Sequence, residues 1–362
     1  MCSSDLVLVG VLILSRRIAG AVGWLLGVPL VFYRREDGVP VALHDECPHR
    51  FAPLSDGCLV GNHVQCPYHG LEFDSAGRCV LNPHPPGSIP LRMKVRAYPL
   101  VERHGLLWIW MGDADKADPQ RIPDFNYLDD TGRWHTVRSY FHLPFGADLM
   151  FDNLMDLSHA EYLHRGTVSQ GYNEGSAPRM TVDEVEGNGV RVCWVLSNYQ
   201  ATEVVRGMNS SSPVVEHHRE TTWWAPGVVK VHLYSLPAGM PRDEAPMRIN
   251  AHLITPETAT STHDFSFWSR DFDMEGRQNS DAAVAATQRK VIVEEDGTLL
   301  EKIQRRMGDR SFESMDPVLF DVDVGASRVR RAMAALVDQE RSAEAGSADA
   351  TGNRTLAPRK GD

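Results

Sequence analysis

The sequence predicts an α+β protein in which a compact all-β unit precedes a larger unit with an antiparallel sheet flanked by helices. Short β-type runs separated by turn residues fill positions 21–112, and a helical pattern without Pro or Gly appears at 147–164. Further strands between 180 and 268 precede long helical stretches, and strands grouped in this way favour antiparallel pairing. With 362 residues, the chain is long enough for two domains with separate cores.

The first domain is expected at residues 21–120. Asp37-Gly38 joins its first two strands, and this dipeptide between apolar runs favours a hairpin. Ala114–Pro123 is rich in Asp, Lys and Pro and is interpreted as a linker. Residues 1–20 are an unassigned start, because the apolar run Leu6–Leu14 is far shorter than the ~20 residues of a membrane span and fits a first strand or an irregular beginning. The predicted strands are Leu30–Arg34, Val39–Leu43, Met93–Val101 and Leu106–Met111.

The second domain is expected at residues 121–340. Its helical patterns cover Ala147–His164, Ala282–Met307 with an interruption at Gly297, and Arg328–Glu340. A sheet with helices in this order is a helix-grip-like arrangement. Residues 341–362 are rich in Ala, Gly, Ser and charged residues, which predicts a disordered tail. The predicted strands are Met180–Val185, Val190–Leu196, Thr221–Trp224, Val228–Leu236, Arg248–Ile254 and Thr262–Trp268.

Charge and cysteine usage restrict the possible partners and compartment. The net charge of −11 disfavours binding to nucleic acid and to anionic membranes, so neither partner is expected. Two of the six cysteines belong to a metal-binding pattern, which favours reduced thiols over disulfides in a chain of this size. We therefore expect a cytoplasmic protein.

Two short motifs in the first domain offer metal ligands in matching order. Cys47 and His49 form Cys-x-His, Cys66 and His69 form Cys-x-x-His, and sixteen residues separate the two motifs. This order and spacing predict a Rieske [2Fe–2S] cluster, in which two Cys hold one iron and two His hold the other. A structural zinc site is the alternative, although zinc fingers usually keep like ligands together.

A second group of possible ligands lies in the helical stretch at 147–164. Asp156 and His159 are three residues apart and share a helix face. His159 and His164 are five apart, so both reach one metal only if the helix ends or bulges between them, for example in a π-bulge. Two His and one carboxylate form the facial triad that binds non-haem Fe(II) and leaves positions open for O₂ and substrate. Histidines that are merely hydrogen-bonded are the alternative.

The third ligand is expected from Glu294-Glu295-Asp296. Asp296 shares an apolar helical stripe with residues 292, 299, 300 and 303, where a carboxylate is costly unless it is paired or binds a metal. Asp296 is therefore preferred and Glu295, which shares that face less well, is the second choice. An ordinary capping or surface acid is the alternative for Asp296.

Three strings occur in a characteristic order: Cys-Pro-His-Arg at 47–50, Cys-Pro-Tyr-His-Gly at 66–70 and Asn-Leu-Met-Asp-Leu-Ser-His at 153–159. Over roughly residues 20–340 the chain resembles the Rieske non-haem iron oxygenases, and most closely the oxygenase subunits of the vanillate and dicamba O-demethylase group. The resemblance implies that the four motif residues hold the cluster and that two histidines and a carboxylate hold the iron. The implied ligands are Cys47, His49, Cys66 and His69 for the cluster, and His159, His164 and Asp296 for the iron.

The resemblance also implies roles for three further residues. Asp156 would link a Rieske His of a neighbouring subunit to His159, so that electrons cross between the chains of a ring-shaped homotrimer. Asn153 would lie near the iron. His252 would hold substrate in the pocket, with an ordinary buried His as the alternative.

The implied activity is that of an aromatic-compound monooxygenase of the O-demethylase type. Such an enzyme uses O₂ together with electrons from NADH, which a flavin/ferredoxin-type reductase delivers, and acts on a small aromatic substrate. Ring hydroxylation, cis-dihydroxylation and steroid-type hydroxylation remain alternatives. A Rieske electron carrier and a zinc-stabilised binding module are alternatives from other classes, although neither needs a second domain with His159 and His164.

Overall fold

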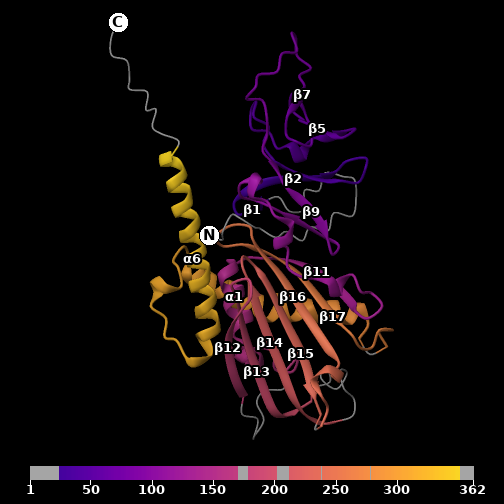
Figure 1. Ribbon diagram of the computed structural model, residues 1–362, viewed down its shortest axis with the longest axis vertical. Helices are drawn as coiled ribbons and strands as arrows, with labels where there is room; N and C mark the ends of the chain where they lie inside the picture. Colours follow the sequence, from indigo (N-terminus) through magenta and orange to yellow (C-terminus); the bar gives the residue numbers. More distant parts are fainter. Residues whose placement is uncertain (1–23, 170–177, 202–211, 238, 278, 351–362) are drawn as a thin grey trace.

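Figure 1 shows the computed structural model, in which an N-terminal β unit lies at one end of a large sheet. The structure describes residues 24–169, 178–201, 212–237, 239–277 and 279–350, and only the backbone of 343–350. The run Leu6–Leu14 lies outside the described residues. The described part of the chain contains no helix with the length and apolar character needed to span a bilayer.

The N-terminal unit consists of two four-stranded antiparallel sheets and a separate hairpin. The predicted hairpin is confirmed, because Arg34 of β2 pairs with Pro40 of β3 around Gly38. The strand predicted at Met93–Val101 is instead divided on either side of Pro99, which has no N–H to donate. The strands are β1 (Trp24–Leu25), β2 (Val28–Arg34), β3 (Pro40–His44) and β8 (Ala97–Tyr98) in one sheet; β4 (Cys58–Val60), β5 (His63–Gln65), β6 (Glu72–Phe73) and β7 (Cys79–Leu81) in the other; and β9 (Leu100–Arg103) with β10 (Leu106–Ile109) in the hairpin.

The predicted linker contains short 3₁₀ turns rather than strands. Asp113 and Asp118 begin the first two turns, and their side chains accept hydrogen bonds from the N–H groups of Asp115 and Gln120. These caps satisfy N–H groups that a short turn would otherwise leave free. The turns are η2 (Ala114–Lys116), η3 (Pro119–Arg121) and η4 (Asn126–Leu128).

The C-terminal unit is built on a seven-stranded antiparallel sheet in the order β11-β17-β16-β15-β14-β13-β12. The first strand, His135–Leu143, is absent from the sequence prediction, although its alternate residues Val137, Phe141 and Leu143 are buried. The predicted antiparallel sheet is otherwise confirmed, with longer strands than expected. The strands are β11 (His135–Leu143), β12 (Pro178–Val185), β13 (Gly189–Gln200), β14 (Val214–Trp224), β15 (Val228–Leu236), β16 (Met247–Pro256) and β17 (Thr262–Arg270).

The helices depart from the prediction in three places. The stretch 147–164 breaks at Asp156, whose backbone is extended (φ −120°, ψ 91°). The stretch 281–307 continues through Gly297, and its middle turn is a π-helix rather than an interruption. Residues 341–350 are helical instead of forming the predicted tail, in a sequence rich in Ala, the strongest helix former. The helices are α1 (Ala147–Met155), η5 (Leu157–His159), α2 (Ala160–Leu163), α4 (Asp281–Arg289), η7 (Lys290–Gly297, the π-helix), α5 (Thr298–Met307) and α6 (Val324–Ala350).

The two faces of the large sheet pack against different partners. Outward-facing residues such as Ala251, Leu253 and Phe267 form one core with the strands of the N-terminal unit. Inward-facing residues such as Val229 and Val231 form another core with α1, α6 and the α4–η7–α5 helix. The space between the inner face and its helices is therefore separate from the core that the outer face shares with the N-terminal unit.

Lys230 of β15 is a buried cation where the two units meet. Its ammonium lies 4.0 Å from the ring centre of Phe125, 5.5 Å from that of Tyr127 and 5.6 Å from that of Trp224. It also donates a hydrogen bond to the carbonyl of Asp124. Burial lowers the pKa of Lys230 to about 8, because the ring faces and one carbonyl only partly replace water.

We predict that Lys230 makes stability depend on pH. Between pH 8 and its ordinary pKa of about 10.4, the unfolded chain binds a proton that the folded chain has released, so stability rises with pH in this window. The unfolding free energy of the wild type relative to Lys230→Met should increase by on the order of 3 kcal/mol from pH 7 to pH 10.5. Urea unfolding of both proteins across this range measures the difference. Lys302→Met, an exposed site on α5, is the control, and a pH-independent difference for Lys230→Met would contradict the prediction.

Candidate metal centres and active site

Two loops of the N-terminal unit share one backbone turn. In each loop the Cys N–H donates to the carbonyl five residues later, and the N–H four residues later donates back to the Cys carbonyl, at 2.8–3.1 Å. The residue at the fourth position has a positive φ, which is 60° at Phe51 and 69° at Gly70. The turn brings the histidine, two or three residues after its Cys, to the tip of each loop. The loops begin at Cys47 and Cys66.

The four predicted cluster ligands differ in their exposure to solvent. Cys47 and Cys66 are buried, whereas His49 is exposed and His69 is half-buried. The two imidazole rings lie 4.5 Å apart, centre to centre. Burial, with a smaller contribution from the neighbouring Cys66, raises the pKa of the Cys47 thiol to about 11. Two sulfurs inside and two imidazoles outside suit a cluster with one iron on each pair.

A single zinc ion suits this arrangement less well. One tetrahedral ion requires its ligand atoms to converge, with Zn–S bonds of about 2.3 Å and Zn–N bonds of about 2.0 Å. Among the described residues, three possible ligand atoms lie within 4.8 Å of one another at His159, His164 and Asp296, which belong to the other domain. The four residues of the two loops do not form such a group. The residues of the two loops therefore fit the cluster better than they fit one zinc ion.

The end of helix α1 at Asp156 positions His159, the first of the two predicted iron-binding histidines. The Asp156 carboxylate accepts a hydrogen bond from the N–H of Ser158 at 2.9 Å and so caps η5. The Asp156 carbonyl accepts a hydrogen bond from Nδ1 of His159. Nε2 of His159 is thereby left without a proton and free to bind a metal. The predicted end of the helix between His159 and His164 is confirmed, because α2 ends at Leu163 and the backbone of His164 is no longer helical. The π-turn lies in the facing helix instead.

The π-helix η7 places two consecutive carboxylates on one imidazole. Glu295 accepts a hydrogen bond from Nδ1 of His164 at 2.7 Å, and Asp296 lies 3.2 Å from Nε2 of the same ring. Thr167 donates a further hydrogen bond to Glu295. Glu295 was the second choice for the third ligand; the structure places it on the opposite nitrogen instead, so it orients His164 and does not join the ligand atoms.

Three ligand atoms converge at this point. Nε2 of His159 lies 3.3 Å from Nε2 of His164 and 3.5 Å from Oδ1 of Asp296, and the third distance is 3.2 Å. Ligands on one face of an octahedron lie about 3 Å apart when bonds of about 2.1 Å meet at right angles. Asn153 donates its amide to Oδ1 of Asp296 at 3.0 Å and fixes the carboxylate. The residues present therefore fit a mononuclear Fe(II) ion.

The charges around the two histidines favour a bound cation. Burial lowers the pKa of His159. Burial acts on His164 in the same direction, but hydrogen bonds and charges from Asp296 and Glu295 outweigh it and raise the pKa of His164. The two carboxylates thus create a negative potential at Nε2 of both rings, which a metal ion would neutralise.

A cavity of about 120 Å³ lies beside this group, between the inner face of the sheet and the helices. Its walls are mostly apolar, with polar side chains from strands β14 and β16. Cavities of roughly 150 Å³ accommodate benzene, so this space suits one aromatic ring. The apolar lining residues are Met150, Leu154, Leu157, Ala160, Val168, Val231, Leu233, Trp268, Val291 and Ile292.

His252 lies in the cavity wall as the resemblance implied. It is buried, and Nδ1 lies 3.0 Å from a carboxylate oxygen of Asp264, which leaves Nε2 for another partner. The sequence argument missed the other polar lining residues, His217, Arg219, Arg248 and Asn250. Alternate positions on a strand share a face, so knowledge of which face was inward would have identified them.

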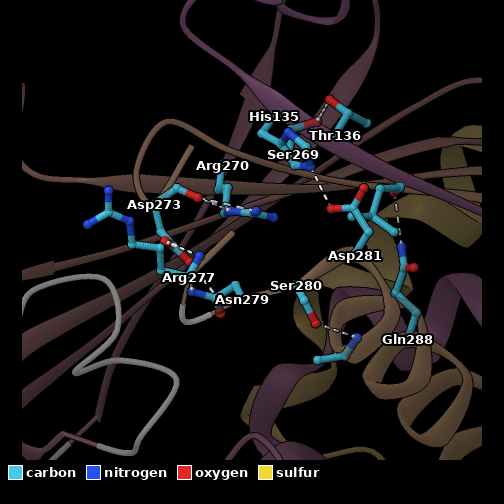
Figure 2. A network of polar contacts seen from close by, with 12 residues as sticks. His135, Thr136, Ser269, Arg270, Asp273, Arg277, Asn279, Ser280, Asp281 and Gln288 are labelled. Carbon is cyan, nitrogen blue, oxygen red and sulfur yellow. Dashed lines mark hydrogen bonds and ion pairs between the residues drawn. The ribbon is translucent and has the colours of Figure 1, made fainter. Parts of the chain in front are cut away.

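The helix that carries Asp296 is anchored to the edge of the sheet. Figure 2 shows His135 of β11 and Asp281 of α4 joined by a contact of 2.6 Å. Ser280 caps α4 by accepting the N–H of Ala283 at 3.3 Å. Two residues before the π-helix, Gln288 accepts a hydrogen bond from Ser139 at 2.7 Å. These contacts fix the register of the helix against β11 and hence the position of Asp296.

Comparisons with known proteins agree with this arrangement. Residues 20–99 match the Rieske [2Fe-2S] domain, and residues 146–339 match the vanillate O-demethylase oxygenase C-terminal domain. The chain is 37% identical to the oxygenase component of dicamba O-demethylase from Stenotrophomonas maltophilia, over 85% of this chain and 89% of that protein. It is 35% identical to the oxygenase component of chloroacetanilide N-alkylformylase from Rhizorhabdus wittichii, over 87% and 90%.

The structural comparison gives the same result. The crystal structure of dicamba monooxygenase bound to dicamba superimposes with a TM-score of 0.82 at 34% identity and covers 94% of this chain and 98% of that one. Both the Rieske [2Fe–2S] cluster and the mononuclear iron are the cofactors of this group. The chain therefore belongs to the family of Rieske non-haem iron oxygenases, in the group that shares the vanillate O-demethylase oxygenase C-terminal domain.

Proposed function

We propose that this protein is the oxygenase component of a multicomponent monooxygenase that O-demethylates or hydroxylates a small aromatic substrate. One observation carries the proposal: the group His159–His164–Asp296 forms part of the wall of an apolar cavity with room for one ring. Two relatives are named for removing a carbon group from their substrate, dicamba O-demethylase and chloroacetanilide N-alkylformylase. O₂ and NADH are the proposed co-substrates.

Each proposed cofactor has its own set of ligands. The [2Fe–2S] cluster is bound by Cys47, His49, Cys66 and His69, and Fe(II) by His159, His164 and Asp296. When bound, the cluster supplies single electrons and the iron supplies O₂ activation.

The surrounding side chains prepare the site for this chemistry. Glu295 and the Asp156 carbonyl hold the protons on Nδ1 of the two histidines, so that both Nε2 atoms face the metal. Asn153 orients Asp296, and the apolar walls exclude water from the substrate ring.

The remaining parts of the proposal concern assembly. A flavin/ferredoxin-type reductase supplies electrons, and the protein works as a cytoplasmic homotrimer. Figure 1 supports transfer between chains, since β5 and β7 lie at the far end of the N-terminal unit from the large sheet. The exposed His49 is accessible to a neighbouring subunit, where Asp156 would connect it to His159. The proposed domain boundaries are 21–120 for the Rieske domain and 121–340 for the catalytic domain, after a start at 1–20. The tail at 341–362 is not proposed, because α6 continues to Ala350.

The electron carrier and the zinc module differ from the proposed oxygenase in the metal content per chain, and steroid-type hydroxylation differs in the size of the cavity it needs. A Rieske electron carrier would contain two iron atoms per chain and a zinc module none, whereas the proposed oxygenase contains three. Steroid-type hydroxylation requires a larger cavity than 120 Å³. Ring hydroxylation and cis-dihydroxylation of a single ring stay open as the second candidate, because the same cavity would accommodate their substrates.

We predict turnover with single-ring methoxy-aromatics. Purified holoenzyme with a suitable reductase, NADH and O₂ should release one formaldehyde for each NADH oxidised, and iron analysis should give about three atoms per chain. Formaldehyde assay and NADH absorbance measure the ratio across a panel of methoxy-, halo- and sulfo-aromatics. Two iron atoms per chain would refute the oxygenase, whereas hydroxylated rings without formaldehyde would favour the second candidate.

Glu295→Ala should lower the iron affinity of the mononuclear site by roughly 10- to 100-fold, because His164 loses the partner that fixes its ring. The cluster should keep its spectrum, since it lies in the other domain. Iron titration of the mononuclear site, with the cluster's EPR signal as an internal reference, measures both. Glu294→Ala is the matched control: its exposed side chain contacts only Arg289 at 3.8 Å among the described ion pairs. Equal affinities for the two variants would exclude an orienting role for Glu295.

Asp156→Asn should leave both metal centres occupied and slow steady-state turnover at least tenfold. Asparagine keeps the oxygen that caps Ser158, so η5 is preserved and only the charge is lost. Iron content, cluster EPR and the rate of mononuclear iron re-reduction measure the effect. Wild-type re-reduction in this variant would rule out Asp156 as the bridge.

A further inference from the structure

A row of arginines crosses the inner face of the sheet at one end of the cavity. Arg219 of β14 lies opposite Leu233 of β15, Leu233 lies opposite Arg248 of β16, and Arg248 lies opposite Arg270 of β17. Residues in lateral register point to the same face of a sheet. The three arginines are only 2–6% exposed, and a buried guanidinium is costly unless it is paired.

Two of these arginines have partners that account for their burial. Arg219 pairs with the buried carboxylate of Glu161 at 2.5 Å. Arg270 donates two hydrogen bonds of 3.3 Å to the carbonyl of Asp273, as Figure 2 shows. Both side chains are therefore explained by the fold alone.

Arg248 has no such partner. Among the described residues, its guanidinium contacts the amide oxygen of Asn279 at 3.5 Å and the rings of Trp268 and Phe272, at 5.8 and 5.9 Å from the ring centres. Within the described ranges no carboxylate lies within ion-pair distance of its guanidinium. Burial and the neighbouring Arg270 lower the pKa of Arg248 to about 10, so it remains charged at neutral pH. An uncompensated cation therefore lies in the cavity wall.

Two neutral groups beside Arg248 also lack partners. Trp268 and Asn250 lie opposite each other on β17 and β16, one inward position along from Arg248, and both line the cavity. The indole N–H of Trp268 and the amide oxygen of Asn250 are buried without a hydrogen-bond partner among the described residues. Buried polar groups in proteins are almost always hydrogen-bonded, so these atoms indicate a polar ligand at the same end of the cavity.

We propose that Arg248 binds the carboxylate of an aromatic acid and thereby sets the substrate class of this enzyme. The planar guanidinium matches a carboxylate with two parallel hydrogen bonds, and the Trp268 N–H offers a third donor nearby. The aromatic ring then lies along Val231 and Leu233, within the cavity that the metal-binding group also lines. The inference rests on the proposed function for the reaction at the other end of the substrate.

The test is calorimetric binding of 4-methoxybenzoate and 4-methoxybenzamide to purified holoenzyme without reductase. The two probes share the ring and methoxy group and differ in charge. The wild type should bind the acid at least tenfold more tightly than the amide. Arg248→Met should lose on the order of 10- to 100-fold in affinity for the acid and keep the amide affinity within about twofold. Arg248→Lys keeps the positive charge but not the two parallel donors of the guanidinium, and should retain part of the preference for the acid over the amide.

A matched control and a stability measurement separate binding from folding. Arg306→Met makes the same substitution at an exposed arginine of α5 that does not line the cavity, and should leave the acid-to-amide ratio unchanged. Arg248→Met removes an uncompensated buried charge, so its Tm without ligand should equal or exceed that of the wild type. A lower Tm would assign Arg248 a structural role and overturn the proposal, as would equal acid and amide affinities in the wild type.

Failure of this inference is distinguishable from failure of the proposed function. Turnover of neutral methoxy-aromatics but not of acids would refute the role of Arg248 and leave the oxygenase standing. A strong acid preference in binding, without turnover of any methoxy-aromatic, would support the anion site and refute the O-demethylase reaction.

Discussion

The catalytic domain depends on the way in which two consecutive carboxylates hold one imidazole. Successive residues of an α-helix point about 100° apart, so Glu295 and Asp296 would normally address different neighbours. Within the π-helix they contact the two nitrogens of His164 instead, Glu295 at Nδ1 and Asp296 at Nε2. The π-turn is thus a local irregularity that the surrounding packing stabilises, which is typical of functional sites. Every other element of the site is arranged around this contact.

The large sheet connects this site to the rest of the molecule. Its inner face supplies the cavity wall and its outer face supplies a core shared with the N-terminal unit. The alternation of side chains along β15 and β16 separates these tasks residue by residue: Val231 and Asn250 line the cavity, whereas Lys230 and Ala251 face the other unit. A one-residue slip of either strand would exchange the two sets, so the register of the sheet determines both the site and the junction.

Sequence reasoning predicted the architecture and the ligand residues because these leave local signals. Fixed spacings indicated Cys47, His49, Cys66 and His69 as candidate ligands, and a carboxylate on an apolar stripe indicated Asp296. The same reasoning missed β11, because polar residues interrupt the alternation of buried and exposed side chains along this strand. It also expected one continuous helix at 147–164, where the helix ends at Asp156. Glu295 and Arg248 differ from ordinary surface residues only through contacts with other elements, so no local pattern distinguishes them.

The shared core behind the sheet also limits how the protein moves. Leu30 and Phe32 of β2 are packed in the same apolar cluster as Leu253 and Phe267 of the catalytic sheet, with no solvent layer between the units. A swinging motion of the Rieske domain would expose this cluster to water at a cost of about 25 cal/mol for each Å². Within one chain the separation of the cluster loops from the iron site is therefore fixed, so a cluster cannot swing toward the iron of its own chain, and the proposed route through a neighbouring subunit needs no such motion.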